Sequence, residues 1–132
     1  KHIMESIDGS LHRLEQDYVD IMYCHRFDEN TPLEETVWAM GDVIRQGKAL
    51  YWGTSCWTAE QLREAHRLAR ELGVPRPIVE QPCFNLLDRS IEAEILPAAQ
   101  ELGMGIAPWS PLAGGILTGK YNNGRPALCS AP

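Results

Sequence analysis

The sequence DYVDIMYCHR, residues 17–26, predicts a buried strand that ends at a histidine. Its centre is rich in β-branched and aromatic side chains and is interrupted by a single acid, Asp20. The polar residues His25, Arg26 and Asp28 close the run. A strand buried on both faces needs cover, which in parallel sheets comes from helices. We therefore expect amphipathic helices before and after it.

Apolar residues at helical spacing predict four helices, over residues 3–15, 32–46, 59–72 and 91–102. Short apolar runs predict three further strands, over residues 49–53, 77–82 and 104–109. Thr31 with Glu34 and Thr58 with Gln61 have the spacing of capping boxes at two helix starts. Ser90 suits the start of the fourth helix, in which Pro97 predicts a kink.

The four strands recur about every 30 residues and alternate with helices, which is the period of a βαβ unit. The sequence therefore predicts an α/β fold with parallel strands. Two architectures compete, an open doubly wound sheet and about half of a (β/α)8 TIM barrel. No G-x-G-x-x-G motif follows the first strand, as a dinucleotide-binding open sheet would require. A flavodoxin-like open domain is a third alternative, and no phosphate loop supports it.

Composition excludes several classes of partner. The chain has 132 residues, a net charge of −6 and no blocks of like charge, so we expect neither nucleic-acid binding nor an anionic membrane surface. It has no apolar run near 18 residues, so we expect no membrane insertion. Four cysteines, Cys24, Cys56, Cys83 and Cys129, lack the spacing of a zinc site. Reduced thiols fit a cytoplasmic location.

Polar residues and one tryptophan follow the predicted strands. In parallel α/β proteins the chemistry lies beyond the carboxyl ends of strands. Those ends carry the following residues: His25 with Arg26, Ser55 with Cys56, Gln81 with Asn85, and Trp109 with Ser110. A histidine can bind a carbonyl oxygen or transfer a proton, amide and hydroxyl groups can hold an amide, and an indole can stack on a planar ring. Each residue alone is more typical of a turn or a core, and only their convergence indicates a site.

Two further groups of residues complete these expectations. The turn over residues 110–115 could bring backbone N–H groups close to a phosphate. Trp38, Trp52 and Trp57 are expected to pack in the core. Cys24 and Cys56 flank the proposed edge, and burial is favoured over reactivity for both.

At these residues the chain resembles the aldo-keto reductase family, in the branch of the potassium channel β subunits and their bacterial reductase relatives. The resemblance covers about residues 3–121 and rests on four motifs: LxRLxxDYVDIMYCHR, the segment from Thr31 to Gly53 ending GKALYWGTS, VEQPCFNLL and GMGIAPWSPLAGGILTGKY. It implies strands four to seven of a (β/α)8 barrel that binds NADPH and reduces aldehydes and ketones. Residues 1–121 would form the half barrel, and residues 122–132 a loop or disordered tail.

The resemblance also implies roles for single residues. His25 matches the histidine that orients the substrate carbonyl. The positions that match cofactor contacts are Ser55 and Gln81 on the nicotinamide carboxamide, Trp109 on the nicotinamide ring, and Ser110, Leu112 and Lys120 toward the pyrophosphate and adenosine. Cys56, also a cofactor-binding position, falls where relatives often have asparagine or arginine. The family's catalytic tyrosine, lysine and aspartate fall outside this chain, so we expect it to be inactive alone. A non-catalytic nucleotide-binding or interaction module of the channel β type is the alternative. In either case a half barrel exposes sheet edges and predicts a homo-oligomer.

Overall fold

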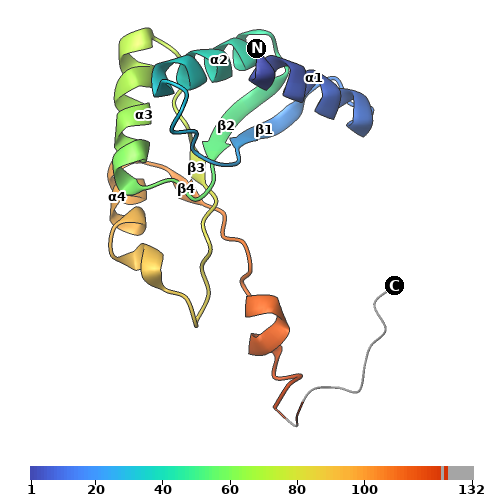
Figure 1. The fold of residues 1–132 in the computed structure, drawn as a ribbon, viewed down its shortest axis with the longest axis vertical. Coiled ribbons are helices and arrows are strands. Elements are labelled where there is room, and N and C mark those ends of the chain that lie inside the picture. Colours follow the sequence, from blue (N-terminus) through green and yellow to red (C-terminus); the bar gives the residue numbers. More distant parts are fainter. Residues whose placement is uncertain (123, 125–132) are drawn as a thin grey trace.

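The computed structural model describes residues 1–122 and 124, and its strands form one parallel sheet. The strands lie side by side in chain order: β1 (Val19–Cys24), β2 (Ala49–Thr54), β3 (Val79–Glu80) and β4 (Gly105–Ile106). The helices are α1 (His2–Leu14), α2 (Leu33–Arg45), α3 (Ala59–Leu72) and α4 (Ile95–Leu102). Figure 1 shows these elements as a curved sheet with helices packed along it.

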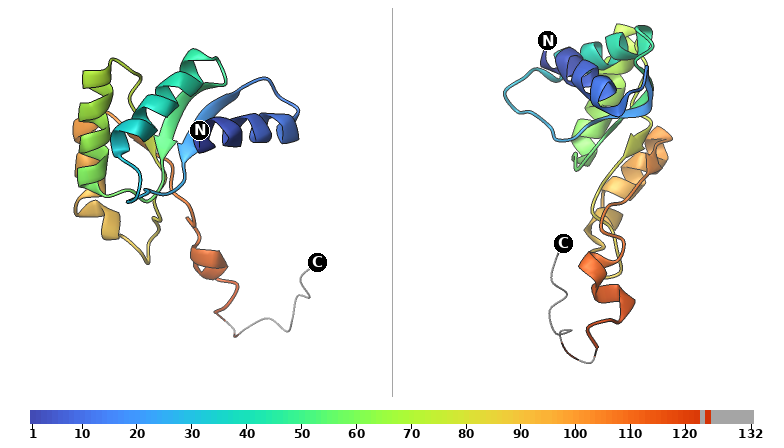
Figure 2. Two further views of the ribbon diagram at one scale, coloured as in Figure 1. Left: turned by 45° about the horizontal axis from the view of Figure 1, so that its top comes forward. Right: turned by 90° about the vertical axis from the view of Figure 1, so that its right-hand side faces the viewer.

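The strand order decides between the two predicted architectures. Crossovers between parallel strands are right-handed in nearly all proteins, so an order that never reverses places every connecting helix on the same face. The helices do follow one another along one side, with α1 against α2, α2 against α3 and α3 against α4 (Figure 2). A doubly wound sheet needs a reversal of strand order. The fold is therefore a partial (β/α)8 barrel, as predicted.

The main core lies between the sheet and its helices. Val37 and Met40 of α2, Trp52 of β2 and Leu62 of α3 are fully buried there. Trp57 is also buried and meets the ring of Phe27 edge to face, with 5.0 Å between ring centroids. This confirms the prediction for two of the three tryptophans.

Trp38 does not pack in the core. Its side chain lies on the outer side of α2, where 46% of the residue is exposed. The guanidinium of Arg45, two turns along the same helix, lies 5.6 Å from the centre of its ring. The predicted core position was wrong because Val37 and Met40, its neighbours in the sequence, take the buried face of the helix.

Only one of the two predicted capping boxes forms. The Thr58 hydroxyl accepts a hydrogen bond from the Gln61 N–H at 3.2 Å, and the Gln61 side chain accepts one from the Thr58 N–H at 2.9 Å. At α2 the Thr31 hydroxyl instead donates to the Asp28 carboxylate at 2.7 Å, and Pro32 is the N-cap residue. The capping prediction at Thr31 was wrong because α2 begins one residue later than the motif predicts, so that Pro32 and not Thr31 occupies the N-cap position.

The predicted fourth helix is divided into two pieces. A 3₁₀ turn, η1 (Ser90–Glu92), is followed by α4, and the break falls at residues 93 and 94. Pro97 lies in the first turn of α4, where its missing N–H has no partner to lose and its fixed φ suits the helix. Where the sequence predicts a kink at Pro97, the structure has the start of α4, two residues before this proline.

The third and fourth strands are shorter than predicted, with two residues each. Pro77, Pro82 and Pro108 occur in these segments, and proline cannot donate to a ladder. The pairing nevertheless continues beyond β4. The Ala107 N–H donates to the Glu80 carbonyl at 3.0 Å and the Trp109 N–H donates to the Pro82 carbonyl at 2.9 Å.

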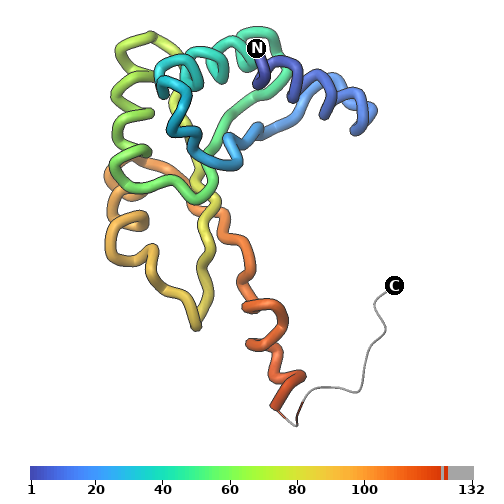
Figure 3. Tube along the Cα trace, in the orientation of Figure 1, coloured from blue at the N-terminus to red at the C-terminus, as the bar shows by residue number. Residues whose placement is uncertain are grey.

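After Trp109 the chain leaves the sheet and enters the 3₁₀ segment η2 (Ala113–Thr118). Gly114 and Gly115 have positive φ values of 63° and 91° inside it. The tube in Figure 3 shows this segment extending away from the four helices. The tail predicted over residues 122–132 lies outside the described residues except for 122 and 124. Over the part of the chain that the structure describes, no helix has the length and apolarity to cross a membrane.

Candidate functional site

The residues that follow the four strands lie along one edge of the sheet. Thr54 pairs with Glu80, Glu80 with Ile106, and Cys83 with Trp109, so successive strands end at nearly the same level. Parallel strands have their carboxyl ends on the same side. The structure therefore brings Ser55, Gln81 and Trp109 to neighbouring positions.

Ser55 connects three strand ends. It is 1% exposed, and its hydroxyl donates to the Gln81 carbonyl at 2.9 Å. Its N–H donates to the Cys24 carbonyl at 3.2 Å. The Arg26 guanidinium donates to the Ser55 hydroxyl at 3.3 Å and to the His25 carbonyl at 2.9 Å. These bonds fix the spacing of the edge before any ligand is present.

Glu80 is a buried carboxylic acid below this edge that sequence reasoning missed. The Thr54 hydroxyl and the Trp57 N–H both donate to its carboxyl group, the latter at 3.3 Å. Burial raises its pKa, while the hydrogen bonds from Thr54 and the backbone of residues 56 and 57 oppose that rise. Glu80 thus holds the loop that carries Ser55 and Cys56. An acid inside a strand predicted to be buried was the signal that could have revealed it.

Cys56 and Trp109 contact each other across the edge. Cys56 is exposed and has a φ of 57°, which turns the chain away from β2. The Trp109 indole N–H donates to the Cys56 sulfur at 3.5 Å. Trp109 remains 43% exposed. Over the described residues, the Gln81 side chain makes no hydrogen bond, so its amide is available to a ligand.

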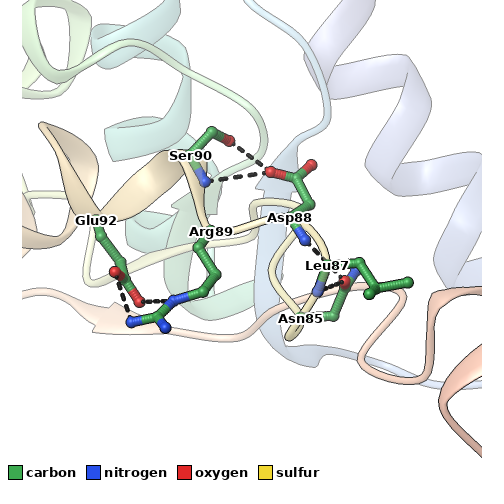
Figure 4. A network of polar contacts seen from close by, with 6 residues as sticks. All are labelled: Asn85, Leu87, Asp88, Arg89, Ser90 and Glu92. Atoms are coloured by element: carbon green, nitrogen blue, oxygen red, sulfur yellow. Dashed lines mark hydrogen bonds and ion pairs between the residues drawn. The ribbon is translucent and has the colours of Figure 1, made fainter.

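Asn85 serves its own loop. Its side-chain oxygen accepts hydrogen bonds from the N–H groups of Leu87 and Asp88 at 2.9 and 3.0 Å (Figure 4). Its amide nitrogen donates to the Ser110 carbonyl at 3.1 Å. Asp88 in turn accepts from the N–H and hydroxyl of Ser90, which lowers its pKa. These bonds make Asn85 a turn residue that ties the loop after β3 to the segment after β4.

His25 lines a groove next to the edge of the sheet that carries Ser55. This groove of about 470 Å³ runs between α1, the end of β1 and the start of α2, and His25, Arg26, Phe27 and Trp57 are among its lining residues. The His25 side chain is exposed. Arg26 links the two parts of the edge, because its guanidinium bonds the His25 carbonyl and the Ser55 hydroxyl.

The thiol of Cys24 faces the helix core. Burial raises the pKa of Cys24 to about 12, so this sulfur is a neutral thiol near neutral pH. The expectation of burial therefore holds for Cys24, whereas Cys56 is exposed and the same expectation for it was wrong. The positive φ at Cys56 explains the difference, because it turns this residue out of the strand.

The remaining predicted contacts lie after β4. Ser110 has a φ of 56° and sits beside Asn85. Leu112 is 53% exposed. The Lys120 ammonium lies 5.0 Å from the centre of the Tyr121 ring, at the far end of η2. Among the described residues, no cluster of three or more potential ligands could hold a metal ion.

Comparison with known proteins places these features in a family. Residues 1–129 match the model of the "Aldo/keto reductase family". The chain is 55% identical over 126 residues to a probable voltage-gated potassium channel subunit beta of Oryza sativa subsp. japonica, covering 95% of this chain and 38% of that protein. It is 54% identical over 125 residues to a protein of the same description from Arabidopsis thaliana, covering 94% and 38%. The chain thus spans 38% of the length of both relatives.

Proposed function

Because the chain belongs to the aldo/keto reductase family, we propose that it forms the nicotinamide side of an NADPH-dependent carbonyl reductase site. The observation that carries this proposal is the meeting of Ser55, Gln81 and Trp109 at one edge of the sheet. Hydroxyl, amide and indole groups are the kinds of side chain that a carboxamide-bearing aromatic ring needs.

The residues present fit such a ring. Gln81 has an amide without a hydrogen-bond partner in the described chain, and Trp109, at the neighbouring strand end, has an exposed indole. In our proposal Gln81 holds the carboxamide, the buried Ser55 fixes the Gln81 backbone beneath it, Cys56 borders it and Trp109 stacks on the ring. Ser110, Leu112 and Lys120 would lie toward the phosphates and adenosine. When bound, NADPH supplies the hydride for reduction of the carbonyl.

His25 is the residue that we assign to the substrate, an aldehyde or ketone. Its exposed imidazole at the end of β1 can donate a hydrogen bond to a carbonyl oxygen and so orient it. The family's proton-donating tyrosine has no counterpart that we recognise among these residues. We therefore propose that the 132-residue chain by itself does not reduce carbonyls.

Activity is tested with the purified chain, NADPH and 4-nitrobenzaldehyde. We expect no oxidation of NADPH above the background without protein. Oxidation that His25→Ala abolishes and His12→Ala, a change of an exposed histidine on α1, leaves intact would refute the proposed inactivity.

Cofactor binding is tested by tryptophan fluorescence. We expect NADPH to quench an emission component that Trp109→Phe removes and that Trp38→Phe, at the exposed site on α2, retains. Quenching that is the same in both variants, or none at all, would contradict the nicotinamide site.

The second candidate is a non-catalytic module of the channel β type, either nucleotide-binding or purely for interaction. It is favoured by the descriptions of the relatives in rice and Arabidopsis. Fluorescence quenching without turnover supports the nucleotide-binding form. A chain that neither turns over nor is quenched supports the interaction form.

We also propose that the chain forms a homo-oligomer. Tyr51 of β2 is 51% exposed, and within the part of the chain that the structure describes β1 and β4 are each paired on one side only. Such edges favour association. Sedimentation at micromolar concentration should show a species larger than the monomer, and a stable monomer would refute this. The free thiols of Cys24, Cys56 and Cys83 support our assignment to the cytoplasm.

A further inference from the structure

We propose that Cys56 and Cys83 form a dithiol at the carboxyl edge of the sheet and that a peroxide joins them in a disulfide. The two residues are 27 positions apart in the sequence and follow the neighbouring strands β2 and β3. The inference does not rest on the proposed nucleotide site.

Trp109 places both cysteines in one neighbourhood. Its backbone forms a parallel bridge with Cys83, and its indole N–H donates to the Cys56 sulfur at 3.5 Å. Trp109 therefore contacts both cysteines, Cys83 through its backbone and Cys56 through its indole, and Cys56 is among the groups that act on the Cys83 thiol.

Strand register gives a second, independent argument. Gly53 pairs with Val79 and Thr54 with Glu80, and the Gln81 N–H continues the ladder to the Thr54 carbonyl at 2.8 Å. The Cys56 sulfur lies 3.8 Å from the Gln81 carbonyl oxygen, two residues before Cys83. Continued to residue 56, this register places Cys56 level with Pro82, one residue before Cys83. Adjacent strands are about 4.8 Å apart, and disulfides join residues whose Cα atoms are about 4.4 to 6.8 Å apart.

The two thiols differ in a way that orders the reaction. Cys56 is exposed, whereas Cys83 is half-buried. Burial raises the pKa of Cys83, and the nearby Asp88 and Cys56 raise it further. Cys56 is therefore the sulfur that meets an oxidant first, and Cys83 is the resolving thiol.

The reaction with hydrogen peroxide balances as follows. The Cys56 sulfur attacks one peroxide oxygen, the O–O bond breaks, one water leaves and Cys56 becomes a sulfenic acid. The Cys83 sulfur then attacks the Cys56 sulfur, the S–O bond breaks and a second water leaves. The two thiols lose two electrons in total and one peroxide is reduced to two waters.

The test uses the full chain carrying Cys129→Ser, so that Cys24, Cys56 and Cys83 are the remaining thiols. The protein is treated with one equivalent of hydrogen peroxide, alkylated and digested with trypsin. Cys56 falls in the peptide 49–63 and Cys83 in the peptide 71–89, because trypsin does not cleave between Arg76 and Pro77. We expect these two peptides to be joined in monomeric protein and separated by a reducing agent.

Three variants complete the experiment. Cys83→Ser should stop the pairing and leave Cys56 as a sulfenic acid that dimedone traps. Cys24→Ser, which changes a thiol facing the core, should leave the pairing unchanged. Oxidation of Cys56 to a sulfinic acid while Cys83 stays fully alkylated, or a disulfide between two copies of the chain, would overturn the proposal.

Discussion

Gly53, in the middle of the sheet, should not tolerate even one added methyl group. A Cβ atom at this position would lie 2.6 Å from the Val79 Cγ1, 2.7 Å from the Val79 carbonyl oxygen and 3.0 Å from the Tyr23 ring. The carbonyl belongs to the paired strand and cannot rotate away, so β2 and β3 must separate next to Ser55 and Gln81. Overpacking of this kind costs about 1–3 kcal/mol of unfolding free energy, and we expect Gly53→Ala to lie at the upper end.

Gly105 on β4 is the matched control. A Cβ atom there would meet the Ile78 carbonyl at 3.8 Å and the Val79 side chain at 4.0 Å, which are ordinary contacts. Its φ is not in the left-handed region. Alanine is favoured over glycine inside a strand by roughly 0.5–1 kcal/mol, so Gly105→Ala should be neutral or slightly stabilising. The two variants should differ by about 2 kcal/mol or more.

Urea unfolding followed by tryptophan emission, to which the buried Trp52 and Trp57 contribute, measures both variants. Val79→Ala should cost less stability in the Gly53→Ala background than in the natural chain, since there it also removes the 2.6 Å contact while the carbonyl contact stays. Equal midpoints for Gly53→Ala and Gly105→Ala would refute the packing argument.

Further predictions concern a helix start and two buried titratable groups. Thr58→Ala should lower the unfolding free energy by about 1 kcal/mol through loss of the capping box, while Thr31→Ala should cost less, which urea unfolding will show. Burial raises the pKa of Glu80, so the stability that this group contributes is lost as pH rises from 4.5 through its pKa in the folded protein. Between pH 4 and pH 8 the natural chain should therefore lose more unfolding free energy than Glu80→Gln. Burial, and to a smaller extent Arg76, lower the pKa of His66, so the stability that this group contributes is lost as pH falls below 6.5. Thermal melts at pH 7.5 and pH 5 should therefore show a smaller drop in melting temperature for His66→Leu than for the natural chain.

The class of fold could be predicted from the sequence because the spacing of the apolar residues and the residues typical of helix ends indicate the same helices and strands along the chain. The alternation of strands and helices was enough to predict parallel pairing, and the predicted range 59–72 matches the bounds of α3. The choice between barrel and doubly wound sheet was not available from the pattern, because it depends on whether the strand order reverses.

Local geometry explains what the pattern could not predict. Thr31 and Thr58 occur in the same motif, yet the N-cap of α2 is Pro32 and the Thr31 hydroxyl donates to Asp28, whereas Thr58 is itself the N-cap of α3. The predicted strand ends brought Ser55 and Trp109 to one edge of the sheet, but they did not reveal Glu80, which is buried beneath that edge. A buried acid has no periodic signature, and its partners come from residues more than twenty positions away.

The unreversed order of the strands also has a use in protein engineering. Each unit of helix and strand sits directly beside the one before it in the chain, and none is inserted between two others. A gene carrying two copies in tandem would offer β1 of the second copy to the unpaired side of β4 of the first. Such a duplicated chain is a direct route to a closed ring of eight strands in which each half shields the bare inner surface of the other.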